Sequence, residues 1–144
     1  MKELKHIGSY GLIIDNDKIV LISKVGGPYD GKLDLPGGTI EQDETPEEAL
    51  IRELEEEVGI KVIDYELFDG NSVNVTWNHK GELENIHHIG FFYKIKKYEN
   101  DIKSSINIDN INDDSKGAKY YDIKNLKKEE LSDIAYLEIQ KIRK

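Results

Sequence analysis

The chain has 144 residues, contains no cysteine and carries a formal net charge of −9 at pH 7. This length suits one domain with a real core, the missing cysteines exclude a disulfide framework, and the acidic charge argues against a broad nucleic-acid-binding surface. No apolar run approaches the roughly 20 residues that span a bilayer, and residues 1–5 do not begin a secretion signal. We expect a single domain over residues 1–144, located in the cytoplasm, with no nucleic-acid or membrane partner. The oligomeric state stays open, with a homodimer as one alternative.

Alternating apolar residues near the N-terminus predict two strands, over residues 6–14 and 18–25, joined by a turn at residues 15–17. Residues 35–38, Leu-Pro-Gly-Gly, predict a tight turn. Because glycine has no side chain, the backbone of this turn can approach a ligand closely.

A helix is predicted after this turn, between Thr45 and Gly59. Thr45 is a favourable N-cap, Pro46 suits the first helical position, and Glu48 completes a Thr-x-x-Glu capping box. Gly59 supplies the C-terminal stop. One face of the helix is apolar and consists of Leu50, Ile51, Leu54 and Val58.

Three carboxylates of this helix, Glu53, Glu56 and Glu57, lie on another side of it. Each helical residue advances by about 100°, so the three side chains project within an arc of about 100°. Adjacent carboxylates repel one another unless a cation lies between them, and oxygen ligands suit Mg²⁺ or Mn²⁺. The alternative is a solvated glutamate-rich face, which is the usual role of such residues on a helix.

The second half of the chain continues with strand and helix patterns. A polar turn is predicted at residues 78–81, a polar loop at residues 100–116, and a last helix at residues 127–143. The buried face of that helix is expected to contain Leu131, Ile134, Ala135 and Ile142. The strands are expected at residues 61–68, 72–77, 86–95 and 118–123.

The segment from Gly38 to Ile60 resembles the signature box of the Nudix hydrolase family. Gly38 is followed after five residues by Glu44 and after seven more by Arg-Glu-Leu-Glu-Glu-Glu-Val-Gly-Ile, which matches the family pattern at every constrained position. The resemblance implies an α/β fold, in which an α/β/α sandwich encloses a mixed β-sheet. Only the box is specific, although the order of elements agrees over nearly the whole chain.

The resemblance implies a metal-dependent hydrolysis of a nucleoside diphosphate linked to another group. By position, Glu53, Glu56 and Glu57 would bind Mg²⁺ or Mn²⁺, with a carbonyl of Gly37 or Gly38 as a further ligand. The chemistry agrees, because cations must neutralise a pyrophosphate, orient it and lower the pKa of an attacking water.

The same resemblance assigns Glu53, Arg52 and Glu44 to the catalytic machinery. Arg52 would orient the carboxylates by ion pairing with Glu44 or Glu56. A carboxylate within reach of the attacking water can accept its proton, and Glu53 is the residue we expect to do so.

The substrate is a small-molecule nucleotide, and we expect a nucleoside or deoxynucleoside triphosphate that is hydrolysed to the monophosphate and pyrophosphate. The proline typical of ADP-ribose enzymes of this family is absent, since Val75 and Thr76 stand in its place. The tyrosine typical of dinucleoside polyphosphate hydrolases is also missing. ADP-ribose, nucleotide sugars and dinucleoside polyphosphates remain alternatives. A further alternative is a non-catalytic Nudix-fold module that senses a nucleotide, although such modules usually lose glutamates of the box.

Other polar and aromatic residues carry weaker signals. His87 and His88 alternate on a strand and therefore face opposite sides, so packing or surface roles are favoured over metal binding. Asp114 is a candidate for another acid near the metals. For Trp77 a packing role on the sheet is favoured over stacking on a base.

Overall fold

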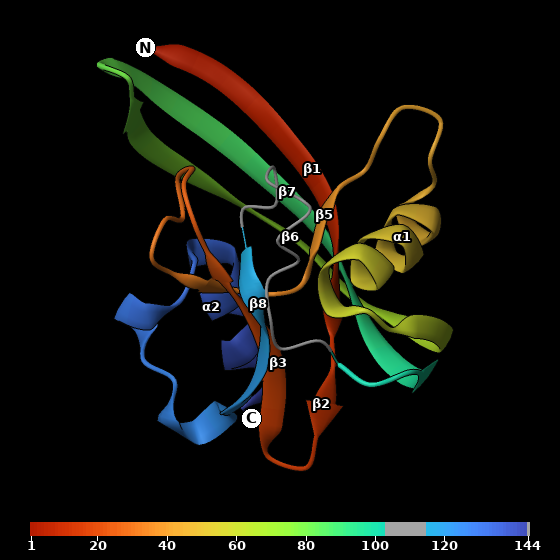
Figure 1. The fold of residues 1–144 in the computed structure, drawn as a ribbon. Coiled ribbons are helices and arrows are strands. Elements are labelled where there is room, and N and C mark those ends of the chain that lie inside the picture. The colour runs from red at the N-terminus through yellow and green to blue at the C-terminus, as the bar shows by residue number, and fades with distance from the viewer. Residues whose placement is uncertain (103–114, 144) are drawn as a thin grey trace.

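The computed structural model describes residues 1–102 and 115–143 (Figure 1). This part of the chain contains the helices α1 (Pro46–Val58) and α2 (Asp133–Ile142), and 3₁₀ helices at Ile123–Asn125 and Lys128–Glu130. None of these helices has the length and apolar character needed to cross a membrane. The strands are β1 (Lys2–Leu12), β2 (Ile14–Asp15), β3 (Lys18–Lys24), β4 (Leu33–Asp34), β5 (Gly37–Thr39), β6 (Lys61–His79), β7 (Glu82–Glu99) and β8 (Ser115–Asp122).

The strands form two sheets. The first has the order β5-β1-β7-β6, in which β1 and β7 run parallel and the other pairs are antiparallel. In the second sheet, β3 pairs antiparallel with β2, β4 and β8. The first sheet is therefore mixed, as the sequence predicted.

The two helices cover opposite sides of the strands (Figure 1). Strand β3 is buried on both of its faces, because alternate residues point toward the two helices. This arrangement confirms the predicted α/β/α sandwich. The core beside α2 includes Tyr10, Leu12, Ile19, Leu21, Phe92, Ile134, Ala135 and Ile139. The core beside α1 includes Ile13, Val20, Ile22, Leu50, Leu54, Val58, Ile60 and Tyr93.

Helix α1 begins and ends where the sequence predicted. The Thr45 hydroxyl accepts a hydrogen bond from the Glu48 N–H at 3.1 Å, and the Glu48 carboxylate accepts one from the Thr45 N–H at 2.9 Å. Gly59 follows the helix in the left-handed conformation, with φ of 82°, and its N–H donates to the carbonyls of Leu54 and Glu55. Both ends of the helix that carries the glutamates are therefore fixed by capping.

Several strands extend further than the sequence predicted. Strand β1 begins at Lys2 rather than at residue 6, and β7 covers Glu82–Glu99 rather than residues 86–95. Strand β6 is continuous over Lys61–His79, although we expected strands at residues 61–68 and 72–77. Asp69, Gly70 and Asn71 favour a turn, but they pair with β7 across a bulge, so sheet pairing prevails over local preference. The expected tight turn at residues 35–38 is also only partly correct, since Gly37–Thr39 pairs with β1 as strand β5.

The C-terminal helix is shorter than predicted. It begins at Asp133 rather than at residue 127, with Ser132 as its N-cap, and the preceding residues Lys128–Glu130 form a 3₁₀ helix. The Ser132 hydroxyl accepts from the Ala135 N–H at 3.2 Å, which starts the helix there. Of the polar loop expected at residues 100–116, residues 103–114 lie outside the described part of the chain.

Candidate functional site

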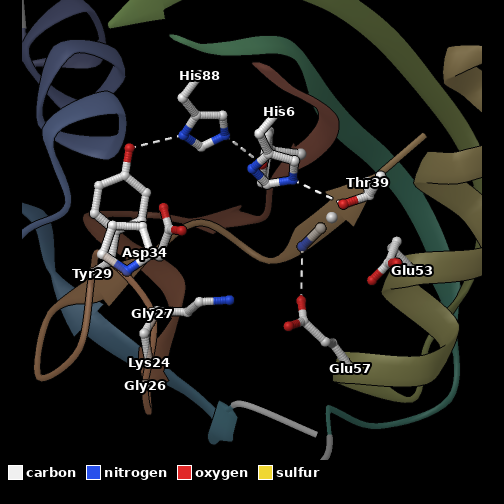
Figure 2. A pocket seen from close by; sticks show the side chains of 14 residues that line it. His6, Lys24, Gly26, Gly27, Tyr29, Asp34, Thr39, Glu53, Glu57 and His88 are labelled. Carbon is white, nitrogen blue, oxygen red and sulfur yellow. Dashed lines mark hydrogen bonds between the residues drawn. The ribbon is translucent and has the colours of Figure 1, made fainter. Parts of the chain in front are cut away.

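A cavity of about 250 Å³ opens between strands β1, β5 and β7 of the first sheet, the loop after β3 and helix α1 (Figure 2). Figure 2 shows polar side chains from several elements directed into it. The cavity is lined by His6, Tyr10, Lys24, Gly26, Gly27, Pro28, Tyr29, Asp34, Gly37, Gly38, Thr39, Glu53, Glu57 and His88.

Two of the predicted metal ligands, Glu53 and Glu57, line this cavity beside Gly37 and Gly38. A carboxylate oxygen of Glu57 accepts a hydrogen bond from the Gly37 N–H at 2.8 Å. Burial raises the pKa of the Glu57 carboxyl to about 8, and that hydrogen bond opposes the change only in part. Burial also raises the pKa of Glu53.

Gly37 and Gly38 have no room for a side chain. A Cβ atom on Gly38 would lie 2.7 Å from the carboxyl group of Glu53. Gly37 has φ of 142°, and a Cβ atom there would lie 2.1 Å from the carbonyl oxygen of Ser9. Gly38 therefore allows strand β5 to approach the Glu53 carboxylate of α1 closely, and Gly37 allows it to approach strand β1.

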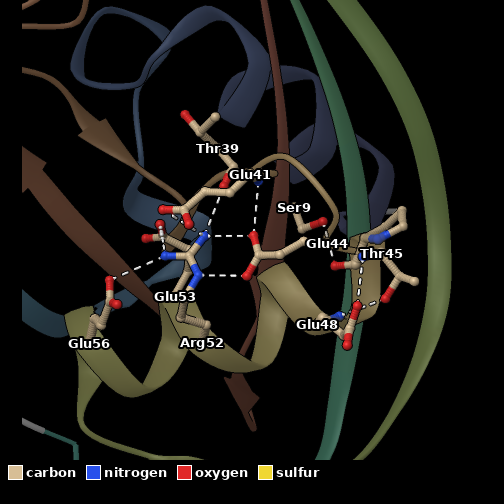
Figure 3. A network of polar contacts seen from close by, with 10 residues as sticks. Ser9, Thr39, Glu41, Glu44, Thr45, Glu48, Arg52, Glu53 and Glu56 are labelled. Atoms are coloured by element: carbon tan, nitrogen blue, oxygen red, sulfur yellow. Dashed lines mark hydrogen bonds and ion pairs between the residues drawn. The ribbon is translucent and has the colours of Figure 1, made fainter.

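Arg52 lies at the centre of an ion-pair network on α1 (Figure 3). Its Nε and Nη2 atoms donate to the two oxygens of Glu44 at 2.7 and 2.9 Å, and Nη1 donates to Glu53 at 2.8 Å and to Glu56 at 3.3 Å. Nη2 also donates to the carbonyl of Thr39 at 3.0 Å. The expected pairing of Arg52 with Glu44 or Glu56 is thus present with both partners.

This network has an electrostatic consequence for Glu44. Hydrogen bonds from Arg52 lower the pKa of the Glu44 carboxyl to about 2, so Glu44 stays ionised. The same hydrogen bonds raise the pKa of Arg52 above its ordinary value. Glu44 is held outside the cavity lining and acts on Glu53 only through the guanidinium group.

The third predicted ligand, Glu56, is placed differently. Its side chain is 58% exposed and pairs with Arg52, and it does not line the cavity. Among residues 1–102 and 115–143, no three His, Asp or Glu side chains are already arranged around one metal position. The donor set nevertheless fits a hard cation, because it offers carboxylate oxygens at a place where burial disfavours their negative charge.

The wall opposite α1 contains residues that the sequence reasoning missed. His88 is buried, and its two ring nitrogens bond to the hydroxyl groups of Tyr10 at 2.6 Å and Tyr29 at 2.8 Å. His6 stacks on His88 with ring centres 4.6 Å apart. Strand alternation predicted that His87 and His88 face opposite sides, but nothing local indicated the tyrosine partners.

Lys24 and Asp34 complete the cavity from strands β3 and β4. Lys24 lies at the end of β3 and points into the cavity in Figure 2. Asp34 is buried, and one of its oxygens accepts from the Ser132 hydroxyl at 2.7 Å and from the Leu35 N–H at 2.9 Å. The cap of α2 is thereby tied to the cavity.

A smaller cleft of about 170 Å³ adjoins the cavity, with which it shares His6, Pro28, Tyr29 and His88. Its other lining residues include Leu4, Val75 and Ile86, which stand side by side across β1, β7 and β6. The two hollows together offer a polar end beside the glutamates and an apolar end on the sheet.

The remaining candidates lie elsewhere. Trp77 is partly buried near the end of β6, where its Nε1 donates to Glu84 at 3.1 Å and its ring stacks on His79. It packs on the sheet, as expected, and does not line the cavity. Asp114 lies outside the described residues.

Residues 5–139 match the sequence profile of the NUDIX domain. The chain is 46% identical over 50 residues to an ADP-ribose pyrophosphatase of Methanocaldococcus jannaschii, which covers 35% of this chain and 30% of that protein. It is also 41% identical over 70 residues to an 8-oxo-dGTP diphosphatase of Proteus vulgaris. That match covers 47% of this chain and 62% of the relative. The chain thus spans less than two thirds of either relative.

Solved structures agree on the fold. A MutT NUDIX hydrolase from Burkholderia pseudomallei superposes with a TM-score of 0.74 at 22% identity and covers 96% of this chain and 98% of its own. A second match is a bifunctional NMN adenylyltransferase/ADP-ribose pyrophosphatase from Francisella tularensis, complexed with AMP and a manganese ion. It superposes with a TM-score of 0.60 at 23% identity, and the match covers 96% of this chain and 41% of that one. Because the family profile is matched over residues 5–139, this chain belongs to the Nudix family.

Proposed function

We propose that this chain is a metal-dependent pyrophosphohydrolase that converts a nucleoside or deoxynucleoside triphosphate to the monophosphate and pyrophosphate. The observation that carries the proposal is the gathering of Glu53 and Glu57 against the backbone of Gly37 and Gly38 in one polar cavity that Lys24 also lines. Carboxylates alone would repel a polyphosphate, so this arrangement favours a site where cations lie between enzyme and substrate.

Mg²⁺ or Mn²⁺ held by Glu53, Glu56 and Glu57, with the Gly38 carbonyl as a further ligand, would neutralise the phosphates and acidify the attacking water. The raised pKa of Glu57 supports this assignment, because a bound cation would stabilise its ionised form. Glu56 would turn from Arg52 toward the cavity. The solved structure of similar fold from Francisella tularensis was obtained with AMP and a manganese ion, which is in line with a divalent cation here.

The proposed role of Glu53 is to accept a proton from the attacking water. One N–H of Arg52 holds its carboxylate at 2.8 Å, and the bidentate pair with Glu44 fixes the guanidinium in turn. A carboxylate held at a defined angle and partly shielded from solvent is suited to general-base catalysis. Water then attacks phosphorus directly, and no covalent enzyme intermediate forms.

We place the nucleoside end of the substrate in the apolar cleft. Leu4, Val75 and Ile86 form a surface of the size and character that a base can cover, next to the polar cavity that would hold the phosphates. The relatives named for 8-oxo-dGTP and ADP-ribose share a nucleoside diphosphate unit that this arrangement could hold. ADP-ribose, nucleotide sugars and dinucleoside polyphosphates therefore stay as alternative substrates.

The test is a panel of nucleoside triphosphates (8-oxo-dGTP included), nucleotide sugars, ADP-ribose and dinucleoside polyphosphates. Each is incubated with the protein and Mg²⁺, and the products are separated by anion exchange. The Glu53→Gln/Glu57→Gln double variant, purified in the same way, controls for contaminating phosphatases. We expect the monophosphate and pyrophosphate from a triphosphate, and only with metal. Tight binding of a panel member without turnover would instead support the nucleotide-sensing module.

Reaction in ¹⁸O-labelled water tests the direct attack. The label should appear in one product only, which identifies the phosphorus attacked. Release of a nucleoside diphosphate and free phosphate would contradict the cleavage position. A phospho-enzyme trapped by acid quenching would contradict direct attack by water.

A further inference from the structure

The wall between the cavity and the apolar cleft consists of a histidine held between two tyrosines. Tyr10 comes from β1, Tyr29 from the loop after β3, and His88 from β7. The Tyr10 hydroxyl lies 2.6 Å from His88 Nε2, and the Tyr29 hydroxyl lies 2.8 Å from His88 Nδ1. Tyr29 and His88 line both hollows. Their contact therefore lies between the cavity proposed for the phosphates of the substrate and the cleft proposed for its base.

Proton counting gives this trio an unused donor. A neutral imidazole has one N–H, which makes one ring nitrogen a donor and the other an acceptor. One tyrosine therefore donates to His88, and the other accepts from it. The accepting tyrosine still has its own O–H proton, which must be directed at a group outside the trio. A charged His88 would leave two such protons, so at least one remains in either state.

Burial indicates that His88 is neutral and that both tyrosines keep their protons. Desolvation lowers the pKa of His88 to about 3 and raises the pKa of Tyr10 and of Tyr29 above the ordinary value. His6, stacked on the His88 ring, further disfavours its protonation. The trio therefore has three protons and two internal hydrogen bonds at neutral pH.

Both tyrosines line the cavity, but only Tyr29 also lines the apolar cleft, and the Tyr10 hydroxyl is the more crowded of the two. The Tyr10 ring stacks on Phe92 in the core, and a Cβ atom added to Gly8 would lie only 2.6 Å from the Tyr10 hydroxyl. Such a crowded hydroxyl is best satisfied by donating to His88 Nε2, since an unmade hydrogen bond in the core is costly. Nδ1 of His88 then carries the proton and donates to Tyr29.

We propose that Tyr29 donates its hydroxyl proton to an oxygen of the bound nucleotide between the base and the cleaved phosphates, and that His88 positions it as this donor. The acceptor is an oxygen of the sugar or of its attached phosphate. Figure 2 shows Tyr29 on the side of the cavity opposite Glu53, which leaves the space between them for the substrate. This assignment rests on the proposed function for the substrate class, but it adds a specificity residue that the Nudix box does not contain.

The test compares Tyr29→Phe with Tyr98→Phe, which removes a hydroxyl bonded to Tyr120 outside both hollows. Tyr29→Phe should raise KM for the preferred triphosphate, by about 3- to 12-fold for a neutral sugar oxygen and by more than about tenfold for a charged phosphate oxygen. Its kcat should stay close to that of the parent, since Glu53 and Glu57 are intact. Tyr98→Phe should leave KM unchanged, because its hydroxyl touches neither hollow.

Substrate analogues then identify the acceptor. If the 3′ oxygen accepts the proton, the KM penalty of Tyr29→Phe disappears with a 3′-deoxynucleotide; if a phosphate oxygen does, the penalty persists. Calorimetry with a non-hydrolysable imido-triphosphate compares the affinities of the parent and the variants without turnover. A failure of the proposed hydrolysis would therefore be distinguished from a failure of the proposed Tyr29 contact. An unchanged KM and affinity in Tyr29→Phe, or an equal loss in Tyr98→Phe, would overturn the assignment.

Discussion

Replacing Glu138 by glutamine is expected to remove a pH dependence from the stability of the fold. Glu138 lies on α2, is fully buried, and has one carboxyl oxygen without a hydrogen-bond partner among the described residues. Its other oxygen accepts from Asn71 at 3.3 Å and lies 3.8 Å from Lys141 Nζ. Lys141 is itself paired with Asp69, so α2 is joined to the bulge of β6 by a carboxyl pair and one ammonium group.

Burial, followed by the effect of the neighbouring Asp69 carboxyl, raises the pKa of Glu138 to about 7. The pKa of an unfolded glutamate is near 4.3. Between pH 4.3 and about pH 7, the folded chain therefore binds more protons than the unfolded chain, and protonated Glu138 stabilises the fold most below pH 4.3. Stability is then lost as the pH rises toward and through 7, by up to about 3 kcal/mol. For a domain of this size, that loss is roughly 10 °C in Tm.

Thermal unfolding of the parent and of Glu138→Gln between pH 5 and pH 8 measures this effect. The glutamine amide can donate to Asp69 at every pH, so the variant should lose much less stability over the interval and should exceed the parent at pH 8. Glu129→Gln, a change of an exposed glutamate before α2, is the matched control and should follow the parent. Parallel curves for parent and Glu138→Gln would refute the assignment of a buried, protonated Glu138.

Three further changes test the candidate site. Glu57→Gln should reduce kcat by orders of magnitude and weaken Mn²⁺ binding in calorimetry while circular dichroism shows an intact fold; parental turnover and metal affinity would refute the metal assignment. Arg52→Lys keeps the charge but loses the planar fork, so kcat should fall markedly with a smaller effect on Tm; an unchanged kcat with a large drop in Tm would make Arg52 purely structural. Gly38→Ala forces a Cβ atom to within 2.7 Å of Glu53, so activity should fall more than for Gly70→Ala, whose Cβ would lie 3.9 Å from the Gly90 carbonyl oxygen; equal losses would show that close approach is unimportant.

The sequence predicted well those features that depend on neighbours along the chain. Thr45, Glu48 and Gly59 set the ends of α1 through contacts within a few residues. The pairing of Arg52 with Glu44 or Glu56 was implied by the family resemblance, and both ion pairs are present. The placement of Gly38 against the helix followed from the family pattern, and the structure supplies its steric reason.

The sequence did not predict features that depend on sheet register. The parallel pairing of β1 with β7 sets His6 opposite His88 although 81 residues separate them, and only that register brings Tyr10 and Tyr29 to the same imidazole. Likewise, the continuous strand β6 depends on pairing with β7 rather than on the turn preference of Asp69–Asn71. Half of the cavity wall therefore had no local signal.

The use made of the two arginines explains how an acidic protein can hold a polyanion. Arg143 donates to the carbonyls of Ile123 and Leu126 and thereby anchors the end of α2. Arg52 is shared among Glu44, Glu53 and Glu56. Neither guanidinium is placed to grip phosphate, and the carboxylates in the cavity would repel it. Under the proposed function, divalent cations would supply the positive charge that neither arginine offers there, and they would release Glu56 from Arg52 to serve as a ligand.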